Sequence, residues 1–174
     1  MKKIILTVFA ATSLLLYSTP SFAFSISLGM PMSSTPKECV GTCETDSLTG
    51  YFLGVQLPFA MGLGMDSHKL KRKGDTISIV TTMYNLYYQL PIPVINLILG
   101  LGVGSQDIEG TGAEFFEGGS ANQWYTSIGF PIMALFDIHL SYRSITSNEM
   151  KIKSSGTKIK NSSTVMGAGF SFGF

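Results

Sequence analysis

GAGFSFGF, residues 167–174, alternates strictly between two kinds of side chain. One set of alternate positions is apolar and mostly aromatic: Ala168, Phe170, Phe172 and Phe174. The other set is glycine and serine. Because successive side chains of a β-strand point to opposite faces, the segment has one apolar face and one nearly bare face. Strands of transmembrane barrels have this sidedness, with hydrocarbon outside and a narrow polar lumen inside. The segment therefore predicts a membrane-spanning strand.

The first 23 residues have the features of a cleavable secretory signal. Two lysines precede an apolar run over residues 4–16, and small residues lie just before position 24. We expect a signal peptide over residues 1–23 and a single barrel domain over residues 24–174. A retained membrane anchor is the alternative, but the run is shorter than the roughly 20 apolar residues that a spanning helix needs.

Composition and length agree with a small membrane barrel. Charged residues make up 13% of the chain, and it has 19 glycines, whereas soluble domains carry about 25% charged residues. Gly, Pro or polar residues interrupt every later apolar stretch, so strands have to make any crossing. With strands of about ten residues, the mature length allows roughly eight. A net charge of +1 gives no electrostatic case for nucleic acid binding.

Eight segments alternate with period two, and this predicts their pairing into a barrel. None has a charged residue on its apolar face, as lipid exposure requires, since Lys or Arg at the bilayer centre costs about 2–4 kcal/mol. A soluble lipocalin-like barrel is the alternative, but its outer strand faces would be charged. The fold class predicted is all-β: an eight-stranded antiparallel up-and-down transmembrane barrel. Its expected strands are residues 24–30, 51–57, 59–66, 77–90, 94–104, 124–130, 136–142 and 167–174.

The connections between these strands alternate in length. Longer polar segments follow the first, third, fifth and seventh strands, and proline marks the short connections, at Pro58, Pro91, Pro93 and Pro131. Short periplasmic turns and longer external loops are typical of such barrels, so both chain ends should lie in the periplasm. The first long loop, about residues 31–50, contains both cysteines. Cys39 and Cys43 are expected to form a disulfide in an exported protein.

Charge gathers in the remaining external loops. Two loops are basic, with Lys69, Lys71, Arg72 and Lys73 in one and Lys151, Lys153, Lys158 and Lys160 in the other. The loop between them is acidic, with Asp107, Glu109, Glu114 and Glu117. Two hypotheses stand: the acidic residues pair with the basic ones, or the basic residues bind the phosphates of lipopolysaccharide or sulfated host glycans.

Together these features resemble the small eight-stranded OmpA/OmpX-like and opacity-type outer-membrane barrels. The segment DIHLSY, residues 137–142, is similar to the penultimate strand of that family, and the ending with Phe170, Phe172 and Phe174 resembles its C-terminal assembly signal. The resemblance implies the outer membrane of a Gram-negative-type bacterium, no cofactor, and outer-membrane lipid, lipopolysaccharide and the barrel-assembly machinery as partners. The family includes adhesins, serum-resistance factors, structural proteins and a few enzymes.

One arrangement is similar to a catalytic motif. His139 and Ser141 resemble the His-x-Ser pair of outer-membrane lipid A deacylases, with Asp137 or Glu149 as the orienting acid. That motif continues with Asn, where this chain has Tyr142, and alternation places His139 and Ser141 on the lumen face, away from acyl chains. The alternative is a lumen ladder in which Asp137, His139 and Arg143 satisfy one another.

Asp66 and His68 could contribute to a metal site, although a hydrated pair at a strand end is the commoner arrangement. No metal is expected.

Inward side chains should fill an eight-stranded lumen, so we expect no steady conductance. The expected plug is Met83, Tyr87, Gln89, Tyr125 and Arg143. The sequence thus favours a non-enzymatic outer-membrane barrel with an adhesin-like or envelope structural role through its external loops. A lipid A-modifying enzyme and a narrow pore are the alternatives.

Overall fold

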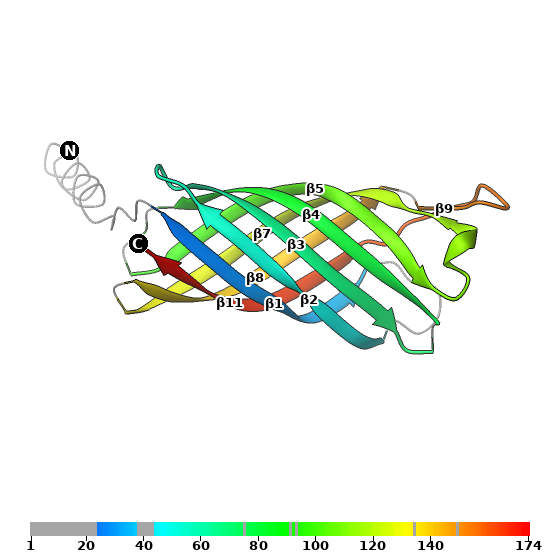
Figure 1. Cartoon of the computed structure of the whole chain (residues 1–174), viewed down its shortest axis with the longest axis horizontal. Coiled ribbons are helices and arrows are strands. Elements are labelled where there is room, and N and C mark those ends of the chain that lie inside the picture. Colours follow the sequence, from blue (N-terminus) through cyan, green and yellow to red (C-terminus); the bar gives the residue numbers. More distant parts are fainter. Residues whose placement is uncertain are drawn as a thin grey trace, which may run out of the picture.

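Eight antiparallel strands close a barrel in a computed structural model, which describes residues 24–37, 44–74, 76–90, 92, 94–133, 135–148 and 150–174 (Figure 1). The prediction of an all-β, eight-stranded barrel is confirmed. Around the barrel the order is β1, β11, β8, β7, β5, β4, β3, β2. The bounds are β1 Ser25–Pro36, β2 Thr45–Gln56, β3 Met61–Arg72, β4 Ile77–Leu90, β5 Asn96–Gly110, β7 Gly119–Met133, β8 Phe136–Asn148 and β11 Ser163–Gly173.

The predicted two faces of each strand are also confirmed. On β5, Leu101 and Val103 are 70% and 64% exposed, whereas Gly100 and Gly102 between them are buried. The inward glycines make room for aromatic rings: a Cβ at Gly100 would lie 2.2 Å from the Tyr125 ring, and one at Gly62 would lie 2.1 Å from Tyr87. Tyrosines that pack against bare backbone therefore occupy much of the lumen, and a cavity of about 60 Å³ remains beside Tyr125, His139 and Arg143.

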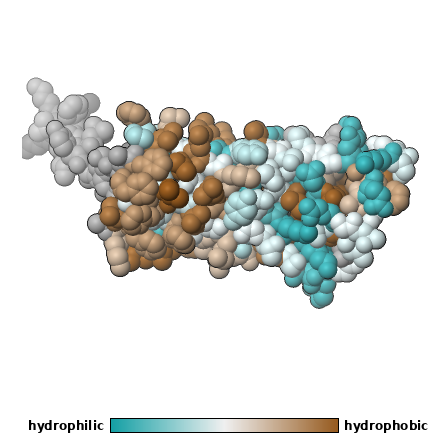
Figure 2. All heavy atoms as spheres, viewed as in Figure 1, coloured by the Kyte–Doolittle hydropathy of each residue, from teal (hydrophilic) through white to brown (hydrophobic). Residues whose placement is uncertain are grey.

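An apolar belt covers the outer wall at the periplasmic end, and polar side chains cover the opposite end (Figure 2). On most strands the outward positions change from apolar to polar at one point; on β5, for example, Val103 is followed by Ser105 and Asp107. β4 is the exception, because Val80 lies outward beyond Thr82, beside Lys69. We call the two parts the belt half and the external half. The outward side chains at the edge of the continuous apolar surface, taken as the boundary, are Met32, Tyr51, Met65, Tyr84, Val103, Trp124, Tyr142 and Met166.

The strands run farther on the external side than the apolar alternation predicts. β3 continues to Arg72 and β5 to Gly110, so Lys69, Lys71 and Arg72 lie in a strand and only Lys73 lies in the turn. The predicted external strand ends were wrong because polar alternation beyond the bilayer resembles a loop in sequence. At the opposite end of the barrel, Pro131 was expected in a short connection but lies within β7, at a bulge.

An apolar plug occupies the interior where the belt ends. It consists of Phe52, Met83, Ala121, Ile145 and Val165, each within three positions of a boundary residue. Met83, Ile145 and Val165 are 0% exposed, and Ala121 and Phe52 are 1% and 6% exposed. The barrel interior is thus closed by packed hydrocarbon at this level.

A small second sheet lies beyond the barrel at the external end (Figure 1). It contains β6 Phe116–Glu117, β9 Met150–Ile152 and β10 Lys158–Ile159, preceded by the 3-10 turn η1 Ala113–Phe115. Register pairs Phe116 with Ile152 and Lys158 with Lys151, so one face is apolar and the other is charged.

Both ends of the described barrel lie at the periplasmic end. β1 pairs with β11 from Ser25–Gly173 to Pro36–Ser163, and the Phe174 N–H donates to the Phe24 carbonyl at 3.0 Å. In the part of the chain that is described, no helix is long and apolar enough to cross a membrane. The predicted signal peptide, Cys39, Cys43 and Glu149 lie outside the described residues.

Candidate functional sites in the lumen and on the external surface

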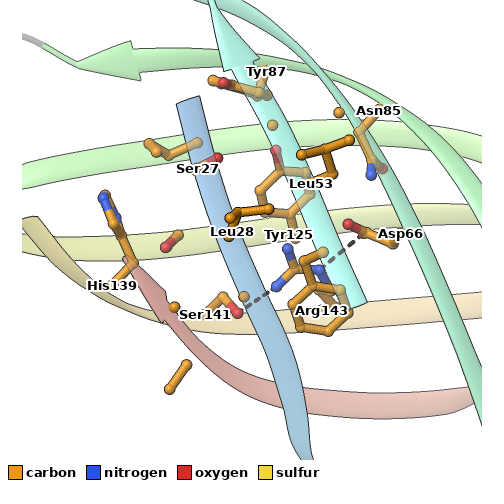
Figure 3. Close-up of a pocket in the computed structure, with 18 of the residues that line it drawn as sticks. Ser27, Leu28, Leu53, Asp66, Asn85, Tyr87, Tyr125, His139, Ser141 and Arg143 are labelled. Carbon is orange, nitrogen blue, oxygen red and sulfur yellow. Dashed lines mark hydrogen bonds and ion pairs between the residues drawn. The ribbon is translucent and has the colours of Figure 1, made fainter. Parts of the chain in front are cut away.

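Arg143 is the centre of the lumen network (Figure 3). Its Nε donates to Asp66 Oδ2 at 2.9 Å, and the two side chains are 8% and 2% exposed. Its guanidinium lies 3.6 Å from the centroid of the Phe52 ring and 4.8 Å from that of Tyr125. It also donates to Ser141 Oγ. A buried charge has to be paired and hydrogen-bonded, and this arrangement satisfies both requirements.

Two amides extend this network. Gln123 Nε2 donates to Asp66 Oδ2 at 2.7 Å and to Asn85 Oδ1 at 2.9 Å. Asp66 therefore accepts from two strands across the lumen, β7 and β8. No group of His, Cys, Asp or Glu suited to a metal ion is found among the described residues, and Asp66 is committed to Arg143. This arrangement corrects the hypothesis that Asp66 and His68 are a hydrated pair at a strand end, since both are buried in the barrel.

A second polar cluster lies nearer the periplasmic end of the lumen. His139 Nε2 is 2.7 Å from Ser171 Oγ, and Ser171 Oγ donates to Asp137 Oδ2 at 3.5 Å. Asp137 also accepts from Asn96 Nδ2. The predicted ladder of Asp137, His139 and Arg143 is therefore wrong in one member, because Arg143 pairs with Asp66 instead.

The predicted catalytic pair is not assembled. Ser141 bonds to Arg143 and to the Gly167 carbonyl at 3.3 Å, whereas His139 contacts Ser171 from β11. A catalytic acid orients histidine through the ring nitrogen that does not face the nucleophile. Asp137 instead lies 4.0 Å from Nε2, on the serine side, and Nδ1 is buried with no partner in the described residues. This geometry favours a structural polar cluster.

The basic residues of β3 face acidic partners. Lys69 pairs with Glu109 at 2.7 Å, Lys73 with Glu44 at 2.9 Å, and Lys71 approaches Asp46 at 3.8 Å. Arg72 donates to Asn161 Oδ1 at 2.6 Å. The pairing hypothesis is thus confirmed for Lys69 and Glu109, while two partners come from the segment before and within β2 rather than from the acidic loop.

The lysines of the second basic segment are arranged differently. Lys151 and Lys158 are direct cross-strand partners in the small sheet, and Lys153 and Lys160 follow at exposed positions. Considering only residues that the structure places, Lys151, Lys153 and Lys160 form no ion pair. The two basic segments have four basic residues each, but they differ in how far acidic partners neutralise their charge.

Solved structures share this fold at low sequence identity. Neisserial surface protein A, NspA, matches with a TM-score of 0.63 and 12% identity, covering 87% of this chain and 97% of that one. The outer membrane protein W of E. coli matches with a TM-score of 0.51 and 11% identity, covering 88% and 98%. Ail, the attachment invasion locus protein of Yersinia pestis, gives a TM-score of 0.44 and 16% identity, covering 86% and 96%.

No protein-family model and no curated protein sequence matches the chain. The evidence for its class is therefore structural: a closed eight-stranded barrel, an apolar belt on its outer wall and a filled polar lumen. This chain has the fold of the small eight-stranded outer-membrane β-barrel proteins of Gram-negative bacteria.

Proposed function

We propose that this barrel acts without catalysis, as a surface protein whose external sheet binds an anionic ligand such as a sulfated glycan. The observation that carries the proposal is the excess of positive charge on one face of the small sheet, the lysine face. Lys151, Lys153 and Lys160 are exposed and form no ion pair among the residues that the structure places. In register, Lys151 lies between Lys158 and Glu117, so cations outnumber carboxylates on this face and attract an anion.

The β3 cations are the weaker candidates. Lys69, Lys71 and Lys73 already face carboxylates, and Arg72 is turned toward Asn161. Binding an external anion there would first require displacing these partners. Lipopolysaccharide phosphates are the second candidate for the same lysine face, because they offer the same negative oxygens.

Heparin affinity of the full mature barrel, folded in detergent, tests the proposal with two matched variants. Reversal of three charges in and beside the small sheet, Lys151→Glu, Lys153→Glu and Lys160→Glu, should weaken heparin binding on the order of tenfold at low salt. Reversal of Lys69, Lys71 and Lys73 to Glu should change it far less. Equal losses in both triple variants, or no heparin binding by the parent protein, would contradict the proposal.

The enzyme and the pore are disfavoured by separate features. His139 lacks an orienting acid at Nδ1, and its serine neighbour lies in the lumen. The apolar plug and the Arg143 network meet at Phe52, and together they occupy the interior. We expect unchanged lipid A mass spectra in an expressing host and no steady conductance in planar bilayers.

We propose a signal peptide over residues 1–23, a disulfide between Cys39 and Cys43, and an assembly role for the ending with Phe170, Phe172 and Phe174. These three phenylalanines are 45%, 46% and 57% exposed on the outer wall, which supports their presentation to a partner.

A further inference from the structure

We propose that the outer wall of the barrel holds a phosphorylated, acylated lipid of the outer leaflet, at a site formed by Lys37, Ser144 and Trp124. The site lies on the wall, at the upper edge of the belt half, and does not involve the small external sheet. It is independent of the function proposed above.

Lys37 supplies the charge for the lipid headgroup. Its backbone N–H donates to the Ser162 carbonyl at 2.8 Å, which extends the pairing of β1 with β11 by one position and turns the side chain outward. The ammonium then reaches across β11 and donates to Ser144 Oγ of β8 at 2.7 Å. An ammonium has three donors, and no carboxylate within the described ranges forms an ion pair with Lys37. Donors are therefore left for an oxyanion.

The level of this cation on the wall is that of lipid headgroups. Ser144 follows Tyr142 at the next outward position of β8 but is only 3% exposed, and its direct partner on β7 is Trp124. The rings of Trp124 and Tyr142 lie 5.6 Å apart, and both are boundary residues. Trp and Tyr side chains mark the interface between hydrocarbon and headgroups. Lys37 is thus placed where a lipid phosphate lies.

An apolar hollow lies on the other side of Trp124. Its volume is about 400 Å³, and it is lined by outward side chains of β3, β4, β5 and β7: Met61, Leu86, Tyr88, Leu99, Leu101 and Trp124. Leu101 is the direct partner of Trp124 on β5. A water molecule occupies about 30 Å³ in the liquid, and a methylene is of similar size, so the hollow accommodates on the order of ten methylenes of an acyl chain.

The two features select one ligand chemistry. A phosphate held by Lys37, whose ammonium is anchored by the buried Ser144, and a hydrocarbon chain in the hollow would lie on opposite sides of a single indole ring. Inorganic phosphate has no chain to fill the hollow. A zwitterionic phospholipid carries its own ammonium beside its phosphate, whereas the phosphate monoester of a lipid A-type glycolipid does not, so the latter gains most from Lys37.

Trp124 is the only tryptophan of the chain, so its fluorescence reports on the site directly. The folded mature barrel is placed in vesicles of brominated phosphatidylcholine, which quench Trp124, and unbrominated lipid is then added. Bisphosphorylated lipid A should relieve the quenching at about one tenth of the mole fraction that dephosphorylated lipid A requires. Inorganic phosphate in millimolar excess should have no effect.

Two variants test this site. Lys37→Gln should make the two lipid A forms equally effective, whereas Lys69→Gln, in the external half and ion-paired with Glu109, should leave the tenfold preference intact. Electrophoretic migration before and after heating verifies that each variant is folded. Equal effectiveness of both forms on the parent protein, or an unchanged preference in Lys37→Gln, would overturn the proposal. Neither result would change the loss of heparin binding expected when Lys151, Lys153 and Lys160 are reversed to Glu, so the two proposals can fail separately.

Discussion

In the belt half of the barrel the exposed side chains are apolar, such as Leu101 and Leu140, and the buried ones include Asp66, Asn85 and Arg143. Just beyond the boundary the outer face is polar, with Asp107 and Lys69 exposed, whereas the interior contains both the fully buried Ile145 and the buried Gln106. The same eight strands pass through both regions, so the backbone does not decide which face is oily. The solvent outside decides it, and a strand changes its pattern where lipid gives way to water.

The largest effect should come from breaking the ion pair of the belt half. Arg143→Ala leaves Asp66 charged and buried without its partner, which costs about 3–5 kcal/mol. Urea unfolding in lipid vesicles, followed by Trp124 fluorescence, measures it. The double variant Arg143→Met, Asp66→Leu removes both charges and should recover a large part of the loss. A double variant as unstable as the single one would show that Asp66 is not the group left unsatisfied.

Truncating the apolar plug should cost slightly less. Ile145→Ala removes a fully buried side chain from the plug and should destabilise the barrel by about 2–5 kcal/mol, because the packed neighbours cannot collapse fully into the space. The matched change in the belt half is Ser127→Ala, which loses one hydrogen bond to the Leu140 carbonyl, worth about 1 kcal/mol. Equal losses in the free energy of unfolding at the two positions would show that truncating the apolar plug costs no more than removing one hydrogen bond in the lumen.

The next largest effect should come from an outward arginine, which should cost far more stability in the belt half than in the external half. Leu99→Arg faces lipid deep in the belt and should cost about 2–4 kcal/mol. Asp107→Arg, four outward positions farther along the same strand, faces water and should stay within about 0.5 kcal/mol. The comparison is made by urea unfolding of both variants in the same vesicles. Similar costs at both sites would mean that the belt does not end at Val103.

The smallest effect concerns a periplasmic turn. Ala60 has φ of 62°, a left-handed conformation that disfavours a side chain. Ala60→Gly should stabilise the barrel by about 0.5–1 kcal/mol. In β11 the same replacement, Ala168→Gly, should instead destabilise it by a similar amount, because glycine loses more entropy in a strand. Unfolding midpoints that move in the same direction for both variants would contradict this reading of the turn.

Sequence alternation was sufficient to predict the barrel because the two-residue period is a property of each strand alone. It predicted the inward positions of Asp66, His139 and Arg143 for the same reason. It could not pair them, since partners across the lumen depend on the stagger of strands distant in sequence. Asp66 and Arg143 come from β3 and β8, which do not neighbour each other.

The serine beside His139 illustrates the same limit at short range. Ser141 is two positions away on the same strand and shares its face, but its side chain runs parallel to that of His139. Ser171, on the adjacent strand, is the direct partner of Asp137 and lies closer to the imidazole. Recognising this pair in the sequence would have required the register of β8 against β11.

The pairing of β1 with β11 has a consequence for how the molecule forms. Every other barrel contact joins strands that follow each other closely along the polypeptide, but this seam joins its earliest described strand to its last. Its loop-closure entropy is therefore the greatest in the fold. Seven strand pairs can form as a curled, open ribbon, and the cylinder closes only when this final edge meets the first.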